Sequence, residues 1–183
     1  MNRSQLEHII RAASAISGDN EIVVIGSQSI HAQIANPPPI AFLSEEADVY
    51  PRNFPERAES IDGAIGELST FHETFGYYAQ GVSPRTAVLA EGWQERLIPL
   101  KTENTGGAAG LCLDVHDLLL AKYAANREKD REFNKAVVAC GFADRCRLLK
   151  LLERMPVSVE SRNGIRNFID ADFAQGNSLP ART

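Results

Sequence analysis

The chain has 183 residues, of which 44% are hydrophobic and 23% are charged, and its formal net charge is −5. This length favours one domain, or one domain with a small helical appendage, and the composition is that of an ordinary globular protein. The negative charge gives no overall electrostatic case for nucleic-acid binding. The sequence contains no stretch of 18 apolar residues, so no membrane span is predicted.

The cysteines and the N-terminal segment bear on the cellular compartment. Three cysteines show none of the spacings of a metal site or a disulfide framework, so we interpret them as reduced thiols. The first ten residues, MNRSQLEHII, lack the apolar core of a signal peptide. We therefore expect a cytoplasmic protein that has no membrane partner.

The first elements along the chain are a helix, a strand and a second helix. Apolar residues at helical spacing predict a helix over residues 4–17, with Ser4 and Glu7 as a capping box. The β-branched run at residues 21–25 predicts a buried strand, and residues 27–34 predict a helix that Ser27 would cap. Gly26 suits the sharp turn between them, and the helix N-terminus would be an anion site.

A second strand is predicted over residues 40–50, after the proline run at residues 37–39, and it carries Glu46 and Asp48. Residues i and i+2 share one face of a strand, so both carboxylates project the same way, about 7 Å apart. Two adjacent acids raise each other's pKa, and a divalent cation such as Mg²⁺ or Mn²⁺ would relieve that conflict. A phosphate-binding turn followed by a metal-binding acid pair is typical of phosphoryl transfer.

These residues resemble the nucleotidyltransferase superfamily with the polymerase-beta-type fold. The runs VIGSQSI at residues 24–30 and EADVYP at residues 46–51 resemble an uncharacterised bacterial branch of nucleotidyltransferase-like proteins (DUF6036-like), which is related to toxins of toxin–antitoxin systems. The resemblance extends from about residue 6 to residue 138. It implies a nucleotidyltransferase fold, a nucleoside triphosphate substrate, and an acceptor that is a tRNA, a protein or a small molecule.

The middle of the chain departs from that family pattern. We expect a helix over residues 53–68, a turn and strand over residues 70–82, strands over residues 86–89 and 93–100, and a flexible loop over residues 102–110. The family often has a third carboxylate on the strand after the acid pair, where this chain offers only Gln80. A glutamate at position 46 replaces the usual aspartate. His31, and the pair His72 and Glu73, are weaker candidates, for which an ordinary structural role is the alternative.

The second half of the chain predicts helices. Residues 114–126 form a strong helical pattern capped by Asp114, and residues 132–140, 144–155 and 159–171 follow as shorter helices. If the first of these continued, Lys122, Asn126 and Asp130 would share a face. By resemblance, Lys122 reaches the nucleotide phosphates, while Arg127 and Asp130 brace the site. The alternative is a helix surface stabilised by ion pairs.

We therefore expect an α/β protein, with a small mixed sheet flanked by helices and a C-terminal helical bundle. Its parts are an α/β core (residues 1–110), a helical region packed on it (111–172) and a disordered tail (173–183). The hypothesis is Mg²⁺-dependent nucleotidyl transfer, in which Glu46 and Asp48 bind the metal, Gly26 and Ser27 hold the triphosphate, and an antitoxin is a partner. The alternative is a module that keeps the fold, binds a nucleotide or a protein, and has lost catalysis.

Overall fold

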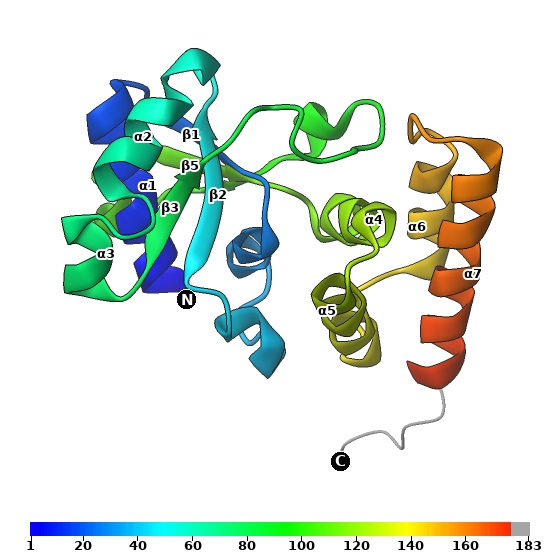
Figure 1. The fold of residues 1–183 in the computed structure, drawn as a ribbon. Coiled ribbons are helices and arrows are strands. Elements are labelled where there is room, and N and C mark those ends of the chain that lie inside the picture. Colours follow the sequence, from blue (N-terminus) through cyan, green and yellow to red (C-terminus); the bar gives the residue numbers. More distant parts are fainter. Residues whose placement is uncertain (177–183) are drawn as a thin grey trace.

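A computed structural model describes residues 1–176, and within them a mixed sheet of five strands has the order β3-β2-β1-β5-β4 (Figure 1). The strands are β1 (Glu21–Val24), β2 (Glu46–Pro51), β3 (Tyr78–Gly81), β4 (Ile98–Leu100) and β5 (Ala109–Cys112). Strand β1 pairs antiparallel with β2 and parallel with β5, β2 pairs parallel with β3, and β5 pairs antiparallel with β4. The expected α/β fold with a small mixed sheet is confirmed.

Helices lie on both sides of this sheet (Figure 1). The α-helices are α1 (Arg3–Ser17), α2 (Ala58–Ile65), α3 (Thr70–Phe75), α4 (Val115–Ala125), α5 (Glu128–Ala139), α6 (Arg145–Leu152) and α7 (Val159–Gly176). Short 3-10 helices are η1 (Ser27–Ala32), η2 (Pro39–Phe42), η3 (Pro55–Arg57), η4 (Trp93–Arg96) and η5 (Glu103–Thr105). Helices α1 to α3 lie on one side and α4 to α7 on the other (Figure 1).

Two hydrophobic cores follow from the alternation of side chains along the strands. Ala47 and Val49 of β2 join the core beneath α1 and α2, whereas Tyr50 joins the core shared with α4 to α7. Alternate residues of a strand face opposite sides, so Glu46 and Asp48 lie on the side of Tyr50. The acid pair is thereby directed toward the helical half of the molecule.

Several predicted boundaries in the first half were wrong. Helix α1 is capped by Asn2, which forms the capping box with Gln5, so the helix starts one residue before the predicted cap Ser4. Ser27 is the first residue of a 3-10 helix and makes no side-chain cap, because Gly26 occupies the cap position. The predicted strand 40–50 begins only at Glu46, where pairing with Tyr78 of β3 starts, and pairing with β1 starts further on, at Val49. Before that point, Pro39 starts the 3-10 helix η2.

The region from residue 70 to residue 112 differs most from the prediction. Residues 70–75 are helical, residues 86–89 form no strand, and the segment from residue 93 contains η4 and then the short strand β4. The loop predicted over residues 102–110 ends in β5, whose Gly110 packs closely under α1. A Cβ on Gly110 would lie 2.4 Å from the Ile10 side chain, so a glycine permits this approach.

The domain boundary and the tail predicted from the sequence can be placed on this fold. The boundary after residue 110 falls inside β5. Residues 173–176 belong to α7, and residues 177–183 of the predicted disordered tail lie outside the described residues. Within residues 1–176, none of the helices combines the length and the apolar character needed to cross a membrane.

Candidate functional site

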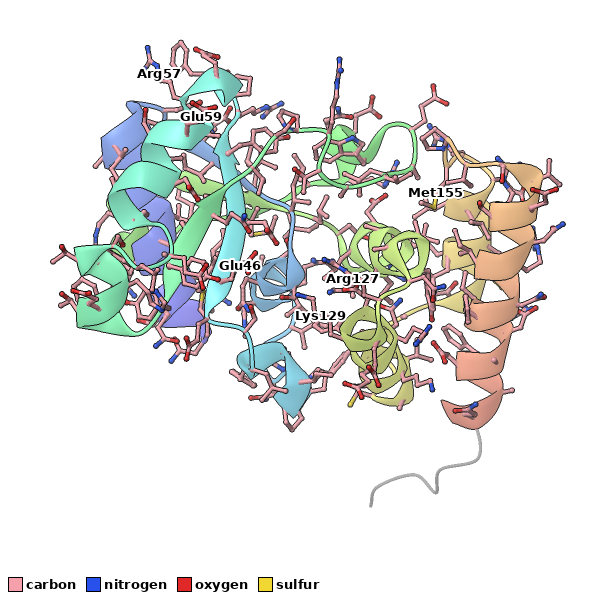
Figure 2. The ribbon with its side chains drawn as sticks, in the orientation of Figure 1. Glu46, Arg57, Glu59, Arg127, Lys129 and Met155 are labelled. Atoms are coloured by element: carbon pink, nitrogen blue, oxygen red, sulfur yellow. The ribbon has the colours of Figure 1, made fainter. Side chains whose placement is uncertain are left out.

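A cavity of about 980 Å³ lies between the sheet and helices α4 and α5. The seven site residues that the sequence suggested all line it: Gly26, Ser27, Glu46, Asp48, Lys122, Arg127 and Asp130. The first four come from the β1–η1 turn and β2, and the others come from α4, α5 and the turn between them. Figure 2 shows Glu46 on the sheet side of this region and Arg127 on the helical side.

The acid pair on β2 has an unusual electrostatic environment. Burial, followed by the neighbouring charge of Glu46 and a hydrogen bond with it, raises the pKa of Asp48 to about 6. Lys122 and Lys129 oppose this shift without cancelling it. Two carboxylates on the same face of one strand therefore compete for ionisation, which a bound cation would relieve.

Gly26 and Asp48 are packed directly against one another. A Cβ at position 26 would lie 2.1 Å from Asp48 Oδ2, which is far inside the contact distance of any two heavy atoms. The turn therefore needs glycine for space, since its φ of −78° is accessible to other residues. The helix that follows is a six-residue 3-10 helix, so this turn lacks the N-terminal dipole of a long α-helix, and Ser27 would have to hold an anion through its backbone N–H and hydroxyl.

Lys122, Arg127 and Asp130 form one ion-pair cluster. Lys122 Nζ donates to Asp130 Oδ1 at 2.8 Å, and Arg127 Nε donates to Asp130 Oδ2 at 2.7 Å. Asp130 is fully buried. Burial alone would raise the pKa of Asp130, but the hydrogen bonds from the two cations outweigh it and lower that pKa.

The route by which these residues meet differs from the prediction. Helix α4 does not continue through residue 130, because Asn126 adopts a left-handed conformation with φ of 52° and ends it. Helix α5 then starts at Glu128 and brings Asp130 back to Lys122. The condition for a shared helical face, a helix that continues through residue 130, is therefore not met, although Lys122 and Asp130 form an ion pair.

Strand β3 contributes two side chains beside the acid pair. Its Tyr78 hydroxyl donates to Glu46 Oε2 at 3.2 Å, and burial together with the charge of Glu46 raises the pKa of Tyr78 to about 12. Gln80 pairs with Asp48 in the ladder and lines the cavity, so an amide stands where a third acid was sought. Sequence reasoning missed Tyr78, although its alternation with Gln80 in the segment YAQG was a usable signal.

The weaker histidine candidates have structural roles outside the cavity lining. His31 is buried, and its ring packs on Phe42 with centroids 5.3 Å apart. His72 accepts a hydrogen bond from the backbone N–H of Leu68. Neither histidine lines the cavity, and neither does Glu73. These contacts agree with the alternative interpretation, in which both histidines have an ordinary structural role.

Comparison with protein families finds a family model that matches nearly the whole chain. Residues 4–173 match the family described as "Nucleotidyltransferase of unknown function (DUF6036)". The chain belongs to this family. The matched range includes every strand of the sheet in the described residues and every residue named in the cavity. No curated protein and no solved structure matched the chain.

The charge balance of the cavity lining is unfavourable for binding a triphosphate, the substrate that a nucleotidyltransferase family implies. Among the described residues that line it, three cations (Lys122, Arg127, Lys129) face four carboxylates (Glu46, Asp48, Asp130, Glu132). A polyanionic triphosphate would find no net positive field there. A divalent cation on Glu46 and Asp48 would reverse that balance at the acid pair.

The donor chemistry of the acid pair suits magnesium. Within residues 1–176 no group of three or more His, Cys, Asp or Glu side chains is arranged to hold a metal. Two carboxylates with the remaining positions left to water and substrate phosphates is a common arrangement for Mg²⁺. The residues present therefore fit that ion.

Proposed function

We propose that this protein is a Mg²⁺-dependent nucleotidyltransferase that moves a nucleoside monophosphate from a nucleoside triphosphate to a hydroxyl acceptor. Mn²⁺ would serve the same ligands. The observation that carries the proposal is the meeting, in one cavity, of the Gly26–Ser27 turn, the acid pair of β2 and the cations of α4 and α5. Membership of a nucleotidyltransferase family supports the same reaction class.

The roles of the side chains follow from their chemistry. Glu46 and Asp48 would hold the metal, which supplies charge stabilisation at the phosphates. Tyr78 orients Glu46 through its hydrogen bond, and Gly26 leaves the space that Asp48 occupies. Ser27 lines the cavity beside Gly26, where its backbone N–H and hydroxyl would donate to phosphate oxygens. Asp130 fixes the positions of Lys122 and Arg127 for contact with the nucleotide.

The proposed reaction is a displacement at the α-phosphorus. The acceptor oxygen forms a bond to that phosphorus while the bond to the bridging oxygen breaks, and pyrophosphate leaves. The hydroxyl proton passes to solvent. Catalysis of this kind is mainly positional and electrostatic.

The acceptor and a partner protein are extensions of this proposal. The resemblance to toxin–antitoxin nucleotidyltransferases makes a tRNA end or a protein hydroxyl the first acceptor to test, with a small molecule next. It also makes an antitoxin the first partner to seek. The assay below identifies the acceptor from the product that carries the label.

The first experiment measures pyrophosphate release and label transfer from each of the four nucleoside triphosphates, with Mg²⁺, total tRNA and cell lysate. We expect Asp48→Ala to lower the signal by about a hundredfold or more, because it removes a ligand of the metal. The matched control is Glu45→Ala, since Glu45 is an exposed acid outside the cavity lining. Equal activity in Asp48→Ala and the wild type would refute the assignment of the acid pair.

A second candidate function is a nucleotide-binding or protein-binding module without catalysis. The specific observations in its favour are Gln80 at the place of a third acid and a glutamate at position 46. Mg²⁺-dependent nucleotide binding in titration calorimetry, with no pyrophosphate release from any triphosphate, would identify this function.

A further inference from the structure

The three cations of the cavity differ in what already binds them. Lys122 and Arg127 both donate to the buried carboxylate of Asp130, at 2.8 and 2.7 Å. Withdrawing either would leave a buried acid less well compensated, which is unfavourable. These two side chains are held in the site before any nucleotide arrives.

Lys129 is the exception among them. Within the described residues it makes no hydrogen bond or ion pair, although it lines the cavity beside Asp130. Its side chain is exposed in the first turn of α5. Figure 2 places Lys129 on the helical side of the region, with Glu46 on the sheet side.

Lys129 lines the same cavity as Glu46 and Asp48, so an anion bound there lies within reach of its side chain. A lysine is a compact charge on a flexible stem with three donors, so it can follow a mobile phosphate chain. Since it has no partner to give up, its binding to an anion is opposed by side-chain entropy and by loss of hydration, and not by the breaking of an ion pair.

We propose that Lys129 binds the terminal phosphates of the nucleoside triphosphate and so positions the leaving pyrophosphate. This inference rests on the proposed function, in which Glu46 and Asp48 would hold the metal and the acceptor attacks the α-phosphorus. Asp130 holds Lys122 and Arg127 where they would contact the nucleotide, and Lys129 supplies a further positive charge that no carboxylate neutralises. The residue therefore distinguishes triphosphates from monophosphates.

The test is titration calorimetry with Mg²⁺ and three ligands: an α,β-methylene nucleoside triphosphate, the nucleoside diphosphate and the nucleoside monophosphate. We expect Lys129→Met to weaken triphosphate binding by about ten- to a hundredfold, as for loss of one charged hydrogen bond. Monophosphate binding should change by less than about twofold. Lys129→Arg should keep most of the triphosphate affinity, because the charge remains.

The matched control is Lys135→Met on the same helix. Lys135 is also exposed on α5, but it does not line the cavity, so its loss should leave all three affinities unchanged. Equal weakening of all three ligands in Lys129→Met, or no weakening, would overturn the inference about Lys129 while leaving nucleotide binding intact. A wild-type protein that binds no nucleotide would instead refute the proposed function, and this inference with it.

Discussion

At the scale of single residues, Gly26 sets the position of the acid that we assign to the metal. A methyl group there would meet Asp48 Oδ2 at 2.1 Å, so Gly26→Ala must displace that carboxylate. A shift of about 1 Å in a catalytic group can lower a rate about a hundredfold. We therefore expect kcat/KM of Gly26→Ala to fall by about that factor, as measured by pyrophosphate release.

The control for this prediction is Gly63→Ala. Nothing lies within 4 Å of a Cβ at Gly63, so the substitution should keep full activity. Gly26→Ala should still fold, since the backbone angles at residue 26 are open to alanine, and thermal unfolding would check this. Activity of Gly26→Ala within twofold of the wild type would show that the Asp48 carboxylate does not need its present position.

At the scale of elements, Asp130 connects α4 to α5. Asp130→Asn removes the charge from a fully buried group that two cations contact, and we expect the free energy of unfolding near pH 7 to fall by about 3 kcal/mol. The folded-state pKa of Asp130 lies below its unfolded value of about 3.9. Its stabilisation is therefore complete above the unfolded pKa and is lost as the pH falls through the folded pKa.

Urea unfolding at a series of pH values measures this effect. The difference between the wild type and Asp130→Asn should stay constant above about pH 5 and shrink steadily below about pH 4. Glu128→Gln, an exposed change in the first turn of the same helix, should alter stability by less than about 1 kcal/mol. A wild-type minus Asp130→Asn difference that stays constant down to pH 2 would contradict the role of the carboxylate charge.

The same two helices show what could be predicted from sequence and what could not. The pattern of residues 114–126 predicted α4 almost to the residue, because its cap and apolar spacing are local signals. The left-handed turn at Asn126 is also local, but only the fold shows that α5 returns to Lys122. A family resemblance and strand alternation predicted that the seven residues serve one site; the structure places all seven around one cavity, and their roles stay a prediction.

Strand β5 and its pairing register could not be predicted from local sequence patterns. Its sequence, AGLC, has weak strand propensity, and its place beside β1 depends on pairing with residues almost ninety positions away. Gly110, one of three glycines in the segment 102–110 that was predicted to be a loop, serves the packing of α1 instead. The predicted start of the strand over residues 40–50 was wrong for a related reason: a strand extends only as far as its pairing partners do, and pairing begins at Glu46.

At the scale of the whole molecule, a bidentate ion pair joins the β3–β4 connection to the helical half. Arg96 Nε and Nη2 donate to Asp117 Oδ2 and Oδ1 at 2.7 and 2.8 Å, and the Asp117 side chain is fully buried. Arg96 also donates to the backbone carbonyl of Ala90. This contact holds the connection against α4.

We expect Arg96→Met to lower the free energy of unfolding by about 3–5 kcal/mol, because it leaves the buried Asp117 carboxylate without its cation. Nucleotide affinity should fall as well, since residues 83 and 86–88 of the same connection line the cavity. Urea unfolding and titration calorimetry measure the two effects.

The double variant Arg96→Met/Asp117→Leu separates charge from packing. It removes the unpaired acid and places apolar groups of similar size at both positions, so most of the lost stability should return. Nucleotide affinity should recover in parallel if the β3–β4 connection packs on α4 again. If the free energy of unfolding of Arg96→Met lies within about 1 kcal/mol of the wild-type value, this ion pair is not what holds the connection. The apolar contacts of Leu89 and Trp93 with the helical core would then have to hold it.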